Sequence, residues 1–434
     1  MPIMYRGFRP LCRLAAAISG AALLTFGLGA WPSVLADSSP IGTPSSNEFG
    51  LNNFHNQVIE NAANRNFTAN WTLTGPTMMD PVIIHGVLYG DTSNPPYGAI
   101  AVNPVNGHVI WFHPFPNQMM NSPIYNQGTL YFGLGNNKFP DVPVVAHPDL
   151  RGTGVNQVVA INAQTGVTQW VYNTAGEDMP SFVLYHQGLY VANGADQVLD
   201  LSPATGQVIR SLAIPSYVSM SSPTVIGHTA YFGGAFPYNM YAVNLNTLKI
   251  TWDTHTRSVG GLDDASPVAN RQNVYTGTVY DDNGQSTAML LAFNRANGKI
   301  RWATRLGIGV RPTQGALYET GVPLLHHGVV YAGSSVSDAV YALNAVNGSV
   351  LWWNQLNHKA IAQAPVLIDH RLLVGDGAGT LFVLNPQNGD VLYSMQFGGG
   401  FMPGVPFVDG NTMFFGSRNG TFFARPISQL IAGK

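Results

Sequence analysis

Cysteine and charge are scarce in this 434-residue sequence. Cys12 is the only cysteine, and it precedes an apolar stretch near the N-terminus. Because residues 37–434 contain no cysteine, that part of the chain forms no disulfide, thiolate metal site or cysteine nucleophile. Charged residues make up 10% of the chain, against roughly 25% in an ordinary soluble protein. The sequence also has no basic cluster of the kind that binds nucleic acid.

The first 36 residues have the pattern of a secretory signal peptide. Arg6, Arg9 and Arg13 precede the apolar stretch 14–28, and small residues before Asp37 supply a cleavage site. The alternative is an uncleaved anchor, because the 18 residues from 14 to 31 are just enough to span a membrane. With cleavage, we expect a chain without a membrane span, located in the periplasm or on the outer cell surface.

An internal repeat predicts the architecture. Eight positions recur at spacings of 40 to 59 residues, and six of them are Trp: Trp71, Trp111, Trp170, Arg210, Trp252, Trp302, Trp352 and Tyr393. Strands that run into tight turns containing Gly precede these positions, as in residues 99–107 and 340–348. Each repeat has room for four short strands, and such units repeated around an axis are typical of propellers. We therefore predict an all-β fold, an eight-bladed β-propeller of four-stranded blades.

The two ends of the repeat region indicate how the ring closes. The last repeat stops at residues 421–426, one strand short, and the strand around residues 66–73 has no preceding partners. We expect this N-terminal strand to complete the last blade. The predicted organisation is a signal peptide at 1–36, an N-terminal extension at 37–64, the propeller at 65–428 and a C-terminal tail at 429–434.

The repeat resembles the pyrroloquinoline-quinone repeat, whose consensus is Tyr-Ala-Leu-Asp-x-x-Thr-Gly-x-x-x-Trp, over nearly all of residues 65–428. Proteins with this repeat include quinone-dependent alcohol dehydrogenases, an outer-membrane assembly lipoprotein, and the tetrathionate hydrolases of acid-loving sulfur oxidisers. In that family the repeated Trp packs between blades. The resemblance therefore implies that the Trp residues of this chain are structural.

The repeat departs from this consensus in its turn. Where the family usually has Asp, this chain has a neutral residue each time: Asn103, Asn162, Ser202, Asn244, Asn294, Asn344 and Asn385. Asp accepts well from turn amides only when ionised, with a pKa of about 3.9, whereas Asn does so at any pH. Together with the scarcity of charge, this indicates adaptation to an acidic compartment. Neutral drift toward Asn is the alternative.

The resemblance implies that function lies in the loops that run from the repeated aromatic to the next strand and converge on the propeller axis. Seven methionines fall there: Met78, Met79, Met119, Met120, Met179, Met220 and Met402. Thioethers are soft and are not protonated in acid, so a ring of them could hold Cu(I) or line a pocket for a sulfur chain. The alternative is that they fill the funnel with apolar volume. No His pair has metal-ligand spacing, and we predict no metal site.

The same loops hold most of the ionisable candidates, which are Asp80, Glu177, Asp178, His255, Arg257, Asp263, Asp264, Arg311, Glu319, His358 and Lys359. We predict Asp263 and Asp264 as the catalytic acid and base, because adjacent carboxylates raise each other's pKa and a His would be protonated in acid. The predicted substrate-binding residues are Arg257, Arg311, Met79, Met120, Met179, Met220 and Met402. An ordinary turn at Asp263 and Asp264 is the alternative.

Three functions remain open. The first is an enzyme resembling tetrathionate hydrolase, with a small anionic substrate and no cofactor. The second is a dehydrogenase with pyrroloquinoline quinone, although the adjacent cysteines that the resemblance would require are missing after residue 36. The third is a non-catalytic scaffold resembling the outer-membrane assembly factor. The long insertion at residues 135–156 either covers the funnel or meets a second subunit of a homodimer.

Overall fold

The structure is a computed structural model that describes residues 58–59, 68–75, 80–139, 150–310, 320–356, 361, 363–401 and 404–432. All of them belong to one compact unit, Asp37–Lys434. The predicted signal peptide and most of the predicted N-terminal extension lie outside the described residues. Within the described ranges, no helix is long and apolar enough to cross a membrane.

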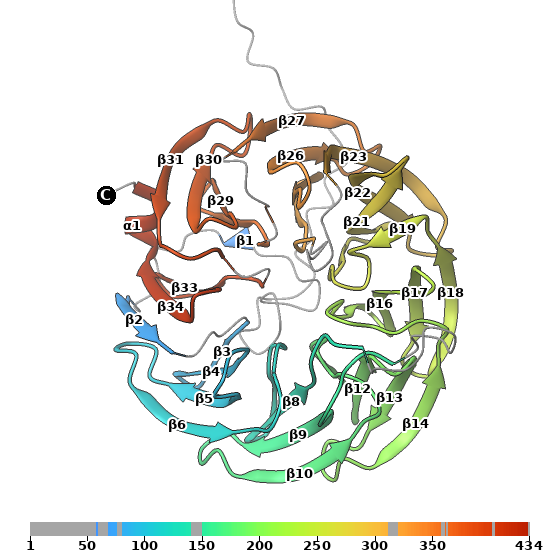
Figure 1. Cartoon of the computed structure of the whole chain (residues 1–434), viewed down its shortest axis with the longest axis vertical. Helices are drawn as coiled ribbons and strands as arrows, with labels where there is room; N and C mark the ends of the chain where they lie inside the picture. The colour runs from blue at the N-terminus through green and yellow to red at the C-terminus, as the bar shows by residue number, and fades with distance from the viewer. Residues whose placement is uncertain are drawn as a thin grey trace, which may run out of the picture. The chain divides into compact units, whose positions relative to one another are not determined.

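The described residues form eight sheets, each a blade, which follow one another around a ring (Figure 1). Consecutive strands pair antiparallel within each blade, from a short inner strand to an outer one. The prediction of an all-β, eight-bladed propeller is confirmed. One short helix, α1 (Ile427–Ala432), follows the last strand.

The first four blades contain these strands: β3 (Val82–Ile84), β4 (Val87–Thr92), β5 (Gly98–Val102) and β6 (Val109–Pro114); β7 (Ile124–Asn126), β8 (Thr129–Leu134), β9 (Gln157–Asn162) and β10 (Thr168–Asn173); β11 (Val183–Tyr185), β12 (Gly188–Asn193), β13 (Gln197–Leu201) and β14 (Val208–Ala213); β15 (Thr224–Ile226), β16 (Thr229–Gly234), β17 (Asn239–Asn244) and β18 (Lys249–His255).

The last four blades contain these strands: β19 (Ser258–Gly260), β20 (Val268–Ala269), β21 (Asn273–Asp282), β22 (Gln285–Asn294) and β23 (Ile300–Val310); β24 (Leu324–His326), β25 (Val329–Gly333), β26 (Ala339–Asn344) and β27 (Val350–Gln355); β28 (Val366–Ile368), β29 (Arg371–Gly375), β30 (Thr380–Leu384) and β31 (Val391–Gln396), with β1 (Val58–Ile59) parallel to β28; β32 (Phe407–Asp409), β33 (Thr412–Ser417), β34 (Thr421–Pro426) and β2 (Trp71–Thr74).

The ring closes through a strand from the N-terminal side, as predicted. Strand β2 pairs antiparallel with β34 and becomes the outer strand of the eighth blade, with Trp71 opposite Ala424 and Thr74 opposite Thr421. In Figure 1 the blue β2 accordingly lies beside the red β33 and β34. The eighth blade thus joins the two ends of the propeller by backbone hydrogen bonds.

The position of a strand within its blade explains its sequence. The middle strand β5 is buried along its whole length, whereas the outer strand β6 alternates between half-buried and exposed residues. Outer strands β10, β27 and β31 show the same alternation along most of their length. A strand that is covered on both faces is apolar throughout. A strand with one solvent-exposed face alternates apolar and polar residues with a period of two.

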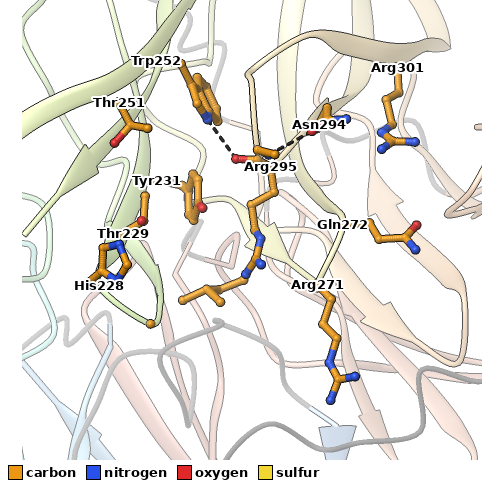
Figure 2. Close-up of a pocket in the computed structure, with 13 residues that line it drawn as sticks. His228, Thr229, Tyr231, Thr251, Trp252, Arg271, Gln272, Asn294, Arg295 and Arg301 are labelled. Atoms are coloured by element: carbon orange, nitrogen blue, oxygen red, sulfur yellow. Dashed lines mark hydrogen bonds between the residues drawn. The ribbon is translucent and has the colours of Figure 1, made fainter.

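The repeated Trp residues link neighbouring blades. Six indole N–H groups each donate to a backbone carbonyl of the next blade over distances of 2.8 to 3.2 Å. Figure 2 shows this bond for Trp252 and the carbonyl of Arg295.

The turn Gly that packs against each of these Trp rings is also required. Gly166 has a φ of 72°, and a Cβ there would lie 2.8 Å from the ring of Trp111.

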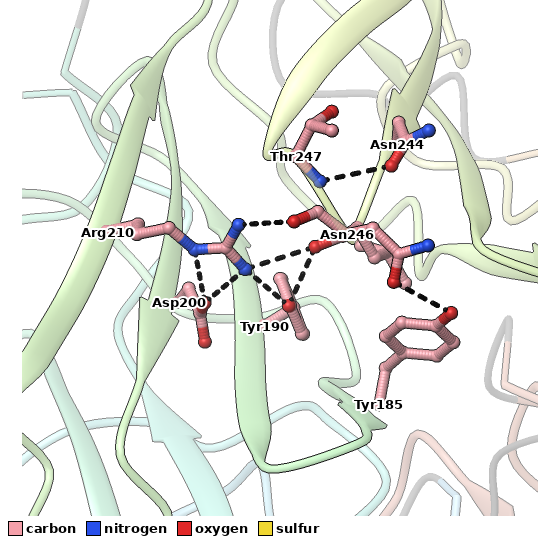
Figure 3. Close-up of polar contacts among 8 residues, drawn as sticks. Tyr185, Tyr190, Asp200, Arg210, Asn244, Asn246 and Thr247 are labelled. Atoms are coloured by element: carbon pink, nitrogen blue, oxygen red, sulfur yellow. Dashed lines mark hydrogen bonds and ion pairs between the residues drawn. The ribbon is translucent and has the colours of Figure 1, made fainter.

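Arg210 replaces Trp in the third blade and makes the equivalent link with its guanidinium (Figure 3). Its Nη2 donates to the carbonyl of Leu245 over 3.1 Å and to Asp200 Oδ2 over 2.6 Å. Asp200 stands opposite Arg210 where Ala242 stands opposite Trp252 in the next blade. A partly buried ion pair therefore fills the space that Trp and Ala fill elsewhere.

Candidate active site

The candidate site lies at the end of the blades where the interblade loops emerge. Strands alternate in direction, so the connection between the two middle strands of a blade leaves from the same end as the loop to the next blade. The insertion between β8 and β9 is such a connection, and Glu177 lies in the loop between β10 and β11. Asp263 and Asp264 lie between β19 and β20. These segments meet in one cluster.

Arg151, from the insertion, is the centre of this cluster. Its Nε lies 3.1 Å from Glu177 Oε1, and its Nη1 lies 3.3 Å from Asp263 Oδ2 and 3.8 Å from Asp264 Oδ1. The Arg151 side chain is 10% exposed, and the Glu177 side chain is fully buried. One guanidinium thus faces three carboxyl groups, of which Asp264 is the most exposed.

Backbone hydrogen bonds fix Arg151 over the third blade. Its N–H donates to the carbonyl of Gly194 over 2.8 Å, and its carbonyl accepts from the N–H of Glu177 over 2.7 Å. Gly152 follows with a φ of 109°, and a Cβ there would lie 2.5 Å from the Glu177 nitrogen. Only Gly permits both this conformation and this close approach. This part of the insertion therefore packs against the loop that carries Glu177.

Two aromatic rings contact the Arg151 guanidinium. Its carbon lies 5.6 Å from the ring centroid of Tyr217 and 5.9 Å from that of Phe139. Tyr217 is buried, whereas Phe139 is 43% exposed. Such rings attract a cation and exclude water from it, which strengthens its electrostatic interactions. Phe139 and Arg151 both belong to the insertion, so the insertion supplies both the charge and part of its cover.

Burial gives the carboxyl groups of the cluster an unusual affinity for protons. It raises the pKa of Glu177 to about 7, against the opposing effect of Arg151. It raises the pKa of Asp263 to about 8, and the neighbouring Asp264 adds to this rise while Arg151 opposes it. With all three carboxylates ionised beside one guanidinium, the cluster would carry a net charge of −2. Protonation of Glu177 and Asp263 removes that excess.

Asp178 and Asp80 are also buried but lie outside the ion cluster. Asp178 accepts from the Thr174 hydroxyl and, over 3.1 Å, from the Asn193 amide, and burial raises its pKa to about 7. Asp80 accepts from the N–H of Val405 and so connects the eighth blade to the first. Serine hydroxyls make the equivalent link in the pairs Ser122 to Ser181, Ser181 to Ser222 and Ser222 to Ser266. Asp80 therefore has a structural function.

The methionines of the interblade loops differ in burial. Of those predicted to bind substrate, Met179 is buried and Met120 and Met220 are half-buried, while the neighbouring Met119 packs in an apolar core. The N–H of Met220 donates to the Asp263 carbonyl over 2.9 Å, which places the Met220 backbone at the cluster. Met79 and Met402 lie outside the described residues.

Of the two arginines predicted to bind substrate, only Arg257 lies within the described residues. Arg257 is exposed, and its guanidinium lies 5.1 Å from the ring centroid of Tyr280. None of its contacts within the described ranges is to the carboxylate cluster. Arg311 lies outside the described residues.

Arg151 was not among the site residues predicted from the sequence. The insertion contains Lys138 and Arg151 as its cationic residues, and the neighbouring loops carry Glu177, Asp263 and Asp264. The signal in the sequence that pointed to Arg151 was a cation in an insertion beside loops that carry acidic residues. Among the described residues, no group of three or more His, Cys, Asp or Glu side chains has an arrangement suited to a metal ion.

The fold and its interblade Trp contacts define an eight-bladed propeller of the quinoprotein-repeat class. The chain belongs to the family described as outer membrane protein assembly factor BamB, which matches residues 96–304 and 286–429. A crystal structure of BamB from Moraxella catarrhalis, at 18% identity, has a TM-score of 0.61 over 82% of this chain and 98% of that one. A europium-containing methanol dehydrogenase, at 12% identity, has a TM-score of 0.58 over 87% of this chain and 88% of its own.

Two curated relatives are tetrathionate hydrolases. That of Acidithiobacillus ferrooxidans is 26% identical over 373 residues, which cover 82% of this chain and 74% of the relative. That of Acidianus ambivalens is 28% identical over 383 residues, which cover 80% of this chain and 70% of the relative.

Proposed function

We propose that this protein is an exported, acid-adapted hydrolase that cleaves a sulfur-chain dianion such as tetrathionate. The observation that carries the proposal is the buried cluster of Arg151 with Glu177, Asp263 and Asp264. The similarity to two tetrathionate hydrolases over most of the chain supports the substrate class.

Acid makes the cluster suitable for an anion. At neutral pH and above, excess negative charge repels a dianion, and the carboxylates compete for Arg151. As the pH falls below about 7, Glu177 and Asp263 gain protons, because burial raises their pKa values to about 7 and 8. Arg151 then faces less negative charge and is able to attract a sulfonate group. Binding therefore strengthens in acid.

The proposed reaction is addition of water to a sulfonate sulfur with cleavage of the adjacent S–S bond. The water oxygen ends on sulfate, and the electron pair of the broken bond ends on the remaining three-sulfur chain. In total, tetrathionate and water give sulfate, a trisulfur monosulfonate dianion and two protons. Asp264, the most accessible carboxyl group of the cluster, would accept a proton from water, and protonated Asp263 would donate one to the leaving sulfur.

The remaining predicted residues fit the periphery of this site. Met120, Met179 and Met220 would offer polarisable contacts to the sulfur chain, and Met79 and Met402 belong to equivalent loops. Arg257 and Arg311 would attract the second sulfonate toward the funnel. These assignments are part of the proposal.

The test is incubation with tetrathionate at about pH 3 and about pH 7, following the loss of tetrathionate and the formation of sulfate. We expect turnover in acid, with a loss of about a hundredfold or more in Asp263→Asn and Asp264→Asn. The control is Asp390→Asn, at an exposed turn at the other end of the blades. Turnover that survives in both cluster variants would refute these roles.

Membership of the BamB family supports a second candidate, a non-catalytic scaffold outside the cytoplasm. A scaffold would use the edges or faces of its blades, and substitutions in the carboxylate cluster would leave it functional. Folded protein that shows no turnover at either pH would favour this function over the hydrolase.

A further inference from the structure

A second polar site lies at the contact between the fourth and fifth blades. It is a cavity of about 570 Å³ whose lining includes the turns at Gly227–His228, Arg271–Gln272 and Asn294–Ala296. These turns join β15 to β16, β20 to β21 and β22 to β23, so they emerge at the opposite end of the blades from the carboxylate cluster. The cavity is therefore separate from the candidate active site.

Positive charge dominates this cavity. Arg271, Arg295 and Arg301 line it together with His228, and none of the lining residues is Asp or Glu. Figure 2 shows the Arg295 side chain in the middle of the cavity, with His228 on one side and Arg271 and Gln272 on the other. Within the described ranges, the guanidinium groups of Arg295 and Arg301 make no ion pair or hydrogen bond. Arg295 is nevertheless half-buried.

The repeat supplies an internal comparison for two of these arginines. Arg295 is the residue whose carbonyl accepts from the repeated Trp. At the other blade contacts that residue is uncharged: Pro104, Ala163, Pro203, Leu245, Ala345 and Pro386. Arg301 immediately precedes the repeated Trp, and the equivalent residues are also uncharged: Asn70, Ile110, Gln169, Ile209, Thr251, Leu351 and Leu392. The structure of the blade thus requires a cation at neither position.

Arg295 and Arg301 line one cavity without an ion-pair partner among the described residues, and like charges repel one another and oppose folding, so a chain poor in charge gains nothing structural from these two. A bound anion removes that repulsion. Guanidinium groups bind oxyanions through paired, charge-assisted hydrogen bonds. A cavity of this volume is of the size that encloses a small ligand.

We propose that this cavity is a binding site for a small dianionic oxyanion of the sulfate type, with Arg295 and Arg301 as its principal ligands. Arg271 and His228 line the same cavity beside them. The site stands on its own geometry and does not depend on the proposed hydrolysis.

The test is titration calorimetry with sodium sulfate at about pH 5, in sodium chloride of matched ionic strength, on the whole protein. We expect saturable binding that weakens about tenfold or more in Arg295→Gln. Lys299→Gln removes the same charge from the same turn but outside the cavity, and should leave affinity unchanged. Arg301→Gln, on an exposed strand position, should weaken binding independently.

Thermal unfolding adds a second readout. Sulfate stabilises many proteins nonspecifically, so the informative quantity is the difference in sulfate-induced Tm shift between Arg295→Gln and Lys299→Gln. The proposal predicts a smaller shift in Arg295→Gln. Equal shifts, or calorimetric binding that persists unchanged in both Arg295→Gln and Arg301→Gln, would overturn it.

Discussion

Arg151 and Asp263 are 112 positions apart in the sequence, yet Arg151 Nη1 lies 3.3 Å from Asp263 Oδ2. The contact joins an insertion of the second blade to the loop that enters the fifth. Arg151 also contacts Glu177 in the loop from the second to the third blade and Tyr217 in the loop from the third to the fourth, so it joins loops from three consecutive interblade junctions. Replacing Arg151 or Asp263 should affect both the stability of this face and the chemistry proposed for it.

Arg151→Gln should destabilise the protein most at neutral pH. The substitution leaves buried carboxyl groups without their cation, which typically costs about 3 to 5 kcal/mol. In acid the loss should be smaller, because Glu177 and Asp263 hold protons there. Urea unfolding at about pH 4 and pH 8 measures the difference. The control is Arg305→Gln, whose side chain is 62% exposed and pairs with Asp282; an equal effect in both variants would contradict the prediction.

The wild-type protein should be more stable in mild acid than above neutrality. Burial raises the pKa values of Asp80, Glu177 and Asp178 to about 7 and that of Asp263 to about 8. Since unfolded carboxyl groups titrate at about 4, the folded state binds these protons more tightly. Their contribution to stability is complete below about pH 4 and is lost as the pH rises through about 7 to 8. The expected total is on the order of a few kcal/mol.

Glu177→Gln tests the source of this pH dependence. A neutral amide cannot ionise, so the variant should lose less stability than the wild type between about pH 4 and pH 8. Denaturant midpoints across this range provide the measurement. A wild-type stability that increases toward pH 8, or a variant with unchanged pH dependence, would show that Glu177 is not protonated in the folded state.

Asn162→Asp tests the acid adaptation of the turns. The Asn162 Oδ1 accepts from the N–H groups of Gln164 and Thr165, both over 3.0 Å. Asp should accept equally well at pH of about 7 but lose much of this capacity once protonated near pH 3. We expect near-equal stability at neutral pH and a deficit of about 0.5 to 1.5 kcal/mol in acid. Identical stability at both pH values would favour neutral drift as the origin of the Asn residues.

Asp200 and Arg210, which pair across two strands of the third blade, permit a double-mutant cycle. Asp200→Ala alone removes one of the four hydrogen-bond partners of the Arg210 guanidinium, whose side chain is 36% exposed, and should cost about 1 to 2 kcal/mol. Combining it with Arg210→Trp restores the residue pair of the other blades and should recover much of that loss. Leu248 limits the recovery, because it occupies the turn position that is Gly beside each Trp. Adding Leu248→Gly should therefore improve the double variant, as measured by thermal unfolding.

The repeated Trp, the turn Gly and the unpaired terminal strand predicted the fold because each acts within a blade or with its neighbour. The candidate site could be predicted only in part. Asp263 and Asp264 could be singled out because adjacent carboxylates are visible in sequence, and the structure brings both to Arg151. Arg151 was not, because its position depends on how the insertion crosses to Gly194 and Glu177, which no local pattern encodes. The ion pair of Asp200 with Arg210 was missed for a related reason, since only the strand register brings the two together.

Ring closure by β2 constrains the order of assembly. The partner of β2 is the last strand of the chain, and closing so long a loop is entropically costly. During synthesis from the N-terminus, β2 must therefore remain unpaired until β34 exists, while the seven blades between them form from local contacts. A factor that binds exposed strands of the nascent chain would therefore have β2 available until β34 has been made.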